Sequence, residues 1–247
     1  MIANEERTEN YVFVSVSDRG INHRLDNVPN QDAVMYEIKE EDFAIAVSDG
    51  VGSCPMADIG SKVAVESVRL TFLDLKNGIL PLELERIVRT IINYWKELIN
   101  NPRIDDFCAT LKAAIKIGKI LYLISIGDGL IIVTSGGMSM CSPIENTLFA
   151  NQTNCLNETV SAEGFWTNSF VLDTYMPYVV FACTDGVANG IKTGQEMELV
   201  REIEEQISKE SLKEELENFL ISISEYGSDD RTVGVVKYER SNAKPFR

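Results

Sequence analysis

The stretch that decides the fold is Ala46-Val47-Ser48-Asp49-Gly50-Val51-Gly52, which follows the apolar residues Phe43-Ala44-Ile45. An apolar run that ends abruptly in Ser-Asp-Gly is typical of a buried strand bounded by a turn. The pattern returns at Phe181-Ala182-Cys183-Thr184-Asp185-Gly186-Val187, where a second apolar run ends in a hydroxyl residue and Asp-Gly. A carboxylate at the end of a buried strand is held rigidly, and the following glycine lets the backbone turn and expose a carbonyl oxygen. Two such strand ends favour a site for Mg²⁺ or Mn²⁺ ions.

Asp-Gly is also a common turn pair, so a single strand that ends this way indicates a turn more often than a metal ligand. Further acidic phrases in matching positions change that balance. They are Pro29-Asn30-Gln31-Asp32-Ala33, Ile126-Gly127-Asp128-Gly129 and Asp229-Asp230-Arg231-Thr232-Val233. Each lies at the edge of an expected strand, which is the arrangement that a cluster of carboxylates requires.

The charge of the chain excludes several classes of partner. Its 247 residues carry a net charge of -15, so it lacks the excess of Lys and Arg that binds nucleic acid or an anionic membrane surface. No run approaches the roughly 20 apolar residues of a membrane span. Residues 1–10 lack the apolar core of a signal peptide, and the five cysteines lack the spacing of a zinc site or disulfide framework. We therefore expect a cytoplasmic protein without nucleic-acid or membrane partners.

The order of expected elements favours an α+β fold. Helices are predicted in two consecutive pairs, with strands before, between and after them, and this order does not suit regular βαβ units. The predicted helices are 58–75, 82–99, 196–208 and 212–222, and the predicted strands are 11–17, 33–38, 43–48, 108–117, 119–126, 130–134, 170–172, 179–184 and 232–238. We expect one domain over residues 1–247, with a core from about 11 to 238 and an irregular excursion at 141–168.

Taken in order, the five acidic phrases resemble those of the metal-dependent Ser/Thr protein phosphatases of type 2C. The bacterial branch of that family has a first motif of Gly, His and then Pro-x-Gln-Asp-Ala, which corresponds to Gly20-Ile21-Asn22-His23 and Pro29 to Ala33. Cys108-Ala109-Thr110-Leu111 and Asn157-Glu158-Thr159 add to the resemblance, which covers residues 11 to 238. It implies a four-layer α-β-β-α sandwich with two mainly antiparallel sheets and a metal centre at one end.

The resemblance also implies a set of metal ligands. Asp49 is expected to bridge two Mn²⁺ or Mg²⁺ ions, and the carbonyl of Gly50 to bind one of them. Asp185 and Asp229 would complete the ligand set of the first ion, and Asp32 would bind the second, directly or through water. These ions prefer oxygen ligands, which suits the residue types.

A third ion and two catalytic groups are expected with less support from the motifs. Asp128, with Asp185, would help to hold a third metal, although the family phrase Gly-Asp-Ser-Arg is here Gly127-Asp128-Gly129-Leu130. Arg24 is the candidate phosphate-binding arginine, and the alternative is a surface residue. His23 is the candidate general acid, and the alternative is a structural hydrogen bond in its loop.

The function implied is hydrolysis of phosphoserine and phosphothreonine on proteins by a metal-activated water, with Asp49, Asp185, Arg24 and His23 as catalytic residues. Phosphorylated proteins, and a cognate Ser/Thr kinase, are the implied partners. Two alternatives stay open. One is a catalytically weak sensor of the same fold that binds phosphoproteins, and the other is a hydrolase of small phosphate esters.

Overall fold

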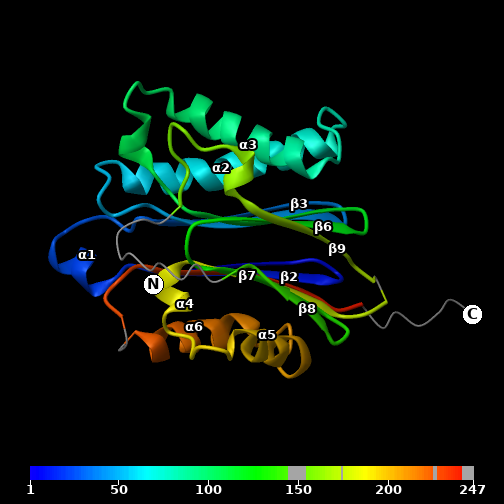
Figure 1. Ribbon diagram of the computed structural model, residues 1–247. Coiled ribbons are helices and arrows are strands. Elements are labelled where there is room, and N and C mark those ends of the chain that lie inside the picture. Colours follow the sequence, from blue (N-terminus) through cyan, green and yellow to red (C-terminus); the bar gives the residue numbers. More distant parts are fainter. Residues whose placement is uncertain (144–153, 174, 225–226, 241–247) are drawn as a thin grey trace, which may run out of the picture.

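The computed structural model describes residues 1–143, 154–173, 175–224 and 227–240. Two sheets pack face to face, and helices cover both outer faces (Figure 1). The strands are β1 (Ile2–Arg7), β2 (Tyr11–Asp18), β3 (Asp32–Lys39), β4 (Asp42–Asp49), β5 (Leu111–Ile117), β6 (Ile120–Ile126), β7 (Leu130–Ser135), β8 (Met138–Cys141), β9 (Trp166–Val171), β10 (Tyr178–Cys183) and β11 (Arg231–Tyr238). The helices are α1 (Ile21–Leu25), α2 (Ala57–Lys76), α3 (Leu84–Ile99), α4 (Asp185–Ala188), α5 (Glu196–Glu205) and α6 (Leu212–Ile223), with 3-10 turns η1 (Ile104–Phe107) and η2 (Ala162–Gly164).

The six-stranded sheet has the order β1-β2-β11-β10-β7-β8, and the five-stranded sheet has the order β3-β4-β5-β6-β9. All neighbouring strands in both sheets are antiparallel. The chain passes from one sheet to the other between β2 and β3, between β6 and β7, between β8 and β9, and between β9 and β10. Three of these four crossings lie at the same end of the sandwich as the last residues of β4 and β10.

The sequence of strand β4 is apolar without interruption because both faces of the strand are buried. Ala44 and Ala46 face the helical layer, whereas Phe43, Ile45 and Val47 face the other sheet. Because side chains alternate along a strand and both faces are covered, every position is buried. Between the sheets, Phe43 meets Phe13 of β2 with ring centroids 5.5 Å apart. This packing fixes the strand ends that carry Asp49 and its partners.

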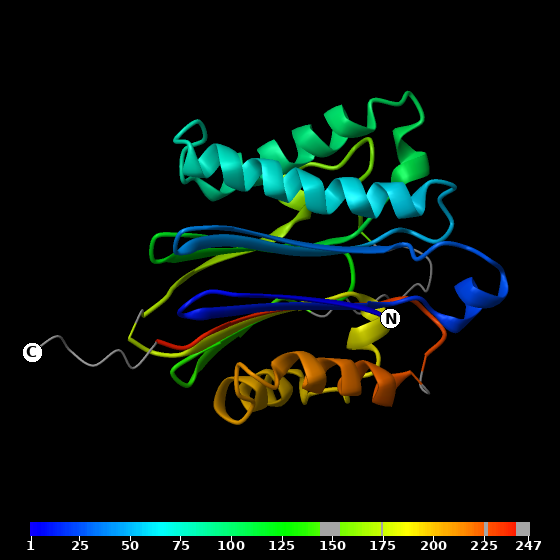
Figure 2. The same cartoon turned by 180° about the vertical axis from the view of Figure 1, so that it is seen from behind.

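The two helical layers are built differently, as both views of the molecule show (Figures 1 and 2). On the five-stranded sheet, α2 and α3 pack against each other, and the indole nitrogen of buried Trp95 donates to the carbonyl of Gly60 at 3.3 Å. On the six-stranded sheet, α5 lies on β7 and β10 and α6 lies on β1 and β2, with little direct contact between the two helices.

The predicted fold class is confirmed, and the predicted strands and helices are present with shifted ends. The sequence did not predict β1, β8, α1 or α4. Edge strand β1 pairs with β2 but is largely exposed, and α1 and α4 are too short for a periodic pattern. The single-domain prediction is untested, and part of the excursion at 141–168 lies outside the described residues. None of the described helices has the length and apolarity needed to cross a membrane.

Candidate metal centre

The β3–β4 hairpin places two of the expected ligands opposite each other. Asp32 begins β3 and Asp49 ends β4, and the register of the hairpin pairs these two residues at its open end. The backbone of Asp49 is fixed on its other side by Thr110, which accepts from its N–H at 3.0 Å and donates to its carbonyl at 2.8 Å. The five-stranded sheet therefore presents two carboxylates in a rigid setting.

The six-stranded sheet and one crossing contribute three more carboxylates. Asp185 follows β10 as the first residue of α4, and Asp229 lies two residues before β11. Asp128 lies in the short connection from β6 to β7, between Gly127 and Gly129, which both have positive φ. The expected ligands thus come from both sheets and from a point where the chain crosses between them.

These carboxylates meet in one cluster at the end of the sandwich. One oxygen from each of Asp49, Asp128 and Asp185 lies within 4.8 Å of the others. Asp32 joins them through a hydrogen bond with Asp49, and the charge of Asp229 acts on both Asp49 and Asp185. All five expected aspartates are therefore brought together, although they come from positions 32 to 229 of the chain.

The electrostatics of the cluster show how unfavourable it is without counter-ions. Burial raises the pKa of Asp32 to about 7. Burial, followed by the charges of Asp128 and Asp229, raises the pKa of Asp185 to about 6. For Asp49, burial and the charges of its neighbours raise the pKa well above its usual value. Loss of water and repulsion between like charges both favour the protonated forms.

The donor set fits hard divalent cations. Oδ1 of Asp32 and Oδ1 of Asp185 are buried and accept no hydrogen bond from the described residues. Buried polar atoms are almost always satisfied, so two unpartnered carboxylate oxygens in one acidic cluster indicate an absent ligand. Mg²⁺ and Mn²⁺ prefer oxygen donors, and their charge would offset the repulsion between the carboxylates.

Two glycines allow the segments of the cluster to approach closely. A Cβ atom on Gly186 would lie 1.9 Å from the carbonyl oxygen of Asp230, and one on Gly50 would lie 2.2 Å from that of Ala57. Glycine is therefore needed after each aspartate because neighbouring backbone lies too close for a Cβ atom, and not only because the chain turns there. The amide of Gly50 donates to the carbonyl of Gln31 at 3.1 Å, and the role of its own carbonyl as a ligand stays a prediction.

His23 is held by a carboxylate that the sequence did not single out. Its Nδ1 lies 2.8 Å from Oδ2 of Asp230, whose side chain is only 1% exposed. The same carboxylate accepts from the amides of Gly20 and Gln31, each at 2.6 Å. Asp230 therefore ties α1 and the start of β3 to the segment that carries Asp229. Its place beside Asp229 is the signal that the sequence offers for this supporting role.

Arg24 is not part of the carboxylate cluster. Its guanidinium pairs with Asp18 at 2.5 Å, and 42% of its side chain is exposed. Asp18 also pairs with Arg231 at 2.6 Å. The structure thus gives Arg24 an ion pair next to His23, and its proposed contact with phosphate stays a prediction.

Two further residues that sequence reasoning missed support the centre. Thr184 donates its hydroxyl to Asp32 at 2.8 Å and accepts from the amide of Thr232 at 3.0 Å, which joins the two sheets. Lys112 is 1% exposed and donates to Ser125 at 2.7 Å and to the carbonyl of Gly127 beside Asp128. A lysine in an apolar strand gives no sequence signal of this role, because its partners lie on the neighbouring strand and the turn after it.

Solved structures with the same fold were found across almost the whole chain. RsbX in complex with magnesium is 16% identical, with a TM-score of 0.60, over 96% of this chain and 100% of that one. The S. agalactiae serine/threonine phosphatase is 15% identical, with a TM-score of 0.64, over 93% and 100%. The catalytic domain of the serine/threonine phosphatase PstP, with two manganese ions, is 15% identical, with a TM-score of 0.60, over 93% and 99%. At these identities the likeness establishes the fold alone.

Sequence comparison assigns the family. No curated protein sequence matches the chain. The family model described as protein phosphatase 2C matches residues 19–221, which include His23, Arg24 and four of the five clustered aspartates. The match spans most of the chain and the sandwich agrees with it, so this protein belongs to the protein phosphatase 2C family.

Proposed function

We propose that the protein hydrolyses phosphoserine and phosphothreonine on other proteins, with Mg²⁺ or Mn²⁺ at the carboxylate cluster. The observation that carries this proposal is the convergence of five aspartates from both sheets, two of which have a buried oxygen that accepts no hydrogen bond from the described residues. Asp32, Asp49, Asp185 and Asp229 would hold two ions, and Asp128 with Asp185 a third. When bound, such ions lower the pKa of a water molecule and neutralise charge on a phosphoryl group.

Two residues of α1 would supply proton transfer and phosphate binding. Asp230 accepts a hydrogen bond from Nδ1 of His23, which keeps a proton on that nitrogen and leaves Nε2 to serve the substrate. His23 would protonate the serine or threonine oxygen as it leaves, because an alkoxide is a poor leaving group at neutral pH. Arg24, one residue further along, would bind the phosphoryl oxygens once its ion pair with Asp18 is exchanged for substrate.

The proposal is tested by phosphate release from a phosphothreonine peptide with Mn²⁺. We expect Asp49→Asn to lower turnover by about 10²- to 10³-fold, since single electrostatic groups at active sites contribute on that scale. Asp58→Asn is the matched control, because Asp58 lies in the first turn of α2 and pairs with Lys62 on the surface. Activity of Asp49→Asn equal to that of the wild type would refute the metal-centre role.

The same assay separates the two alternatives. A phosphoprotein sensor would bind the peptide without enzyme-like turnover. A small-ester hydrolase would prefer p-nitrophenyl phosphate and sugar phosphates to the peptide in direct competition. Asp128 lies in the cluster although its phrase, Gly127-Asp128-Gly129-Leu130, differs from the family's Gly-Asp-Ser-Arg, and this position supports turnover over the sensor alternative.

A further inference from the structure

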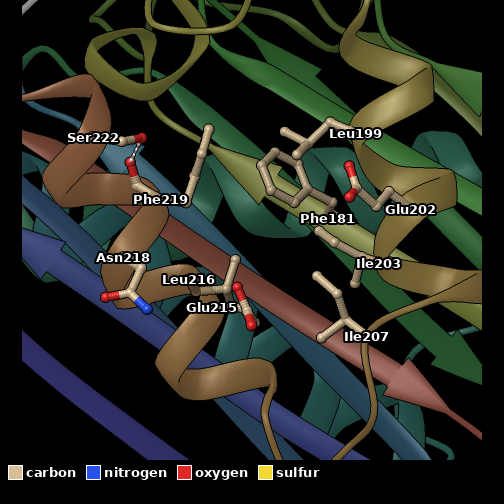
Figure 3. Close-up of a pocket in the computed structure, with 10 residues that line it drawn as sticks. All are labelled: Phe181, Leu199, Glu202, Ile203, Ile207, Glu215, Leu216, Asn218, Phe219 and Ser222. Atoms are coloured by element: carbon tan, nitrogen blue, oxygen red, sulfur yellow. Dashed lines mark hydrogen bonds between the residues drawn. The ribbon is translucent and has the colours of Figure 1, made fainter.

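The outer face of the six-stranded sheet is incompletely covered between α5 and α6. The two helices are short and make little contact with each other, whereas α2 and α3 pack together on the opposite sheet. Figure 3 shows the resulting gap, with side chains of α5 and α6 on either side and Phe181 of β10 between them. Among the described residues, no further element covers the apolar side chains between these two helices.

This gap contains a hollow of about 330 Å³, which we call the α5–α6 groove. Its lining residues are Phe181, Leu199, Glu202, Ile203, Ile207, Glu215, Leu216, Asn218, Phe219 and Ser222. Six of the ten are aliphatic or aromatic. Phe181, Ile203 and Leu216 are buried at the base of the groove, whereas Leu199, Ile207 and Phe219 at its edges are only partly buried and remain in part open to solvent. A volume of this size accommodates a large apolar side chain and part of the backbone that carries it.

A second hollow continues the groove toward α4. It shares Leu199, Glu202 and Phe219 with the first hollow and extends to Gly190 and Ile191, just after α4. Gly190 lies against Ile223 at the end of α6, since a Cβ on that glycine would approach Ile223 to 2.8 Å. The two hollows together form an elongated surface rather than an isolated packing defect.

The surroundings of the groove are strongly acidic. Residues 196–217 contain nine glutamates and three basic residues. Glu202 and Glu215 stand at the groove itself, and neither carboxylate has an ion pair or side-chain hydrogen bond with any residue that the structure describes. The apolar lining is therefore flanked by two carboxylates that form no ion pair within the described part of the chain, although Lys192 lines the adjoining hollow with Glu202.

We propose that the α5–α6 groove docks a basic amphipathic segment of a partner protein, with a bulky apolar side chain in the groove and Lys or Arg over Glu202 and Glu215. Apolar burial would supply affinity, and the opposite charges would orient the segment and speed its association. A second copy of this chain is a poor occupant, because it would bring the same acidic rim against this one. Nucleic acid is excluded by the same charges.

The docking test uses a fluorescent synthetic peptide with central Phe and Leu residues flanked by Lys and Arg, measured by anisotropy against the full chain. Three changes are expected to weaken binding at least 10-fold. They are replacement of the peptide's Phe and Leu by Ser, Glu202→Lys, and Leu199→Glu. Affinity should also fall as salt is raised, because the flanking charges are exposed.

Matched controls separate docking from general attraction between charges. Glu97→Lys is the control for Glu202→Lys, because it makes the same charge change at an exposed position of α3 on the opposite layer. Leu98→Glu, at a leucine that is 44% exposed, is the control for Leu199→Glu. Both should bind the peptide as the wild type does. Equal weakening by Glu202→Lys and Glu97→Lys, equal binding of the Ser peptide, or no binding by the wild type would each overturn the proposal.

Two other occupants give distinct results. Peptide binding that is absent in the full chain and appears only after removal of residues 241–247 would show that the chain's own terminal segment occupies the groove. Dimerisation that Leu199→Glu abolishes would show that a second copy occupies it. Either result would overturn the proposed partner. Neither depends on phosphatase activity, so a failure here is distinct from a failure of the metal centre.

Discussion

At the scale of single residues, Asp230 joins several segments of the candidate site although it is not an expected ligand. Its buried carboxylate accepts from Gly20, His23 and Gln31, and its carbonyl lies against Gly186. One side chain thus fixes the candidate general acid relative to the segments that carry Asp32, Asp185 and Asp229. We expect Asp230 to position His23 rather than to touch substrate.

We expect His23→Asn to slow hydrolysis of a phosphothreonine peptide by about 10²- to 10⁴-fold, the usual contribution of a general acid. Hydrolysis of p-nitrophenyl phosphate should change much less, because nitrophenolate leaves without a proton. Steady-state kinetics on both substrates check this. An equal loss on both would contradict the general-acid role.

Asp230→Asn should reproduce that dependence on the leaving group, because the carboxamide cannot accept from all three donors. It should also lower stability by about 1–3 kcal/mol, the cost of leaving buried donors unpaired. Thermal unfolding of both variants gives the comparison. His23→Asn should retain more stability than Asp230→Asn, since it removes only one of the three donors.

At the scale of elements, the connection from β6 to β7 contains Asp128 and has little free space around its backbone. Gly129 has φ +83°, and a Cβ there would lie 2.5 Å from the carbonyl of Cys183 in β10. The tight passage explains why a three-residue connection can place a carboxylate between the two sheets.

We expect Gly129→Ala to lower stability by more than about 2 kcal/mol, because left-handed strain of about 1–2 kcal/mol adds to the backbone clash. Gly137→Ala is the matched control, with the same φ of +83° and open space around the added Cβ. For a chain of this size, each kcal/mol shifts the melting temperature by about 2–4 °C. Equal shifts in the two variants would show that the contact with β10 is unimportant.

Which elements were predictable depended on how they are buried. β4 and β10 are covered on both faces, so their sequences are continuous apolar runs, and the aspartates that end them were found from that pattern. Edge strand β1 is held mainly by backbone pairing, which leaves no mark in its side chains. The hydrogen bonds by which Asp230, Thr184 and Lys112 support the cluster were not predictable, because their partners come from other strands and loops. Periodicity predicted α5 and α6 but not the gap between them.

At the scale of the whole molecule, the carboxylate cluster links stability to pH and metal. Asp32 has a pKa near 7 in the fold and about 3.9 when unfolded, so the folded state binds the extra proton. Its contribution to stability is therefore present below about pH 4 and is lost as the pH rises to about 7.

In EDTA, Asp32→Asn should remove part of the stability loss that the wild type shows between pH 4 and pH 7. One unit of pKa shift corresponds to about 1.4 kcal/mol, so the two proteins should diverge by several degrees in melting temperature. Unfolding curves across this range check the prediction. Parallel curves for the two proteins would mean that Asp32 titrates normally.

A bound metal ion should offset the loss of stability that ionisation of the clustered carboxylates causes. At a concentration 100 times its dissociation constant, a bound ion adds about 2.7 kcal/mol of stability. We therefore expect Mn²⁺ to raise the melting temperature of the wild type by about 5–10 °C at neutral pH. Asp49→Asn should show little of this increase. A wild type that is indifferent to both Mn²⁺ and chelator would contradict the proposed centre.

The place of β11 in the six-stranded sheet has a consequence for synthesis on the ribosome. β11 lies in the interior of its sheet, between β2 and β10, and it follows directly after Asp229 and Asp230. Strands β3 to β6 can pair with one another while the chain is still emerging, because they are neighbours in sequence. β2 and β10, in contrast, must wait for β11 before they are joined. Translation must therefore pass residue 238 before the nascent chain can complete the six-stranded sheet and bring all five carboxylates together.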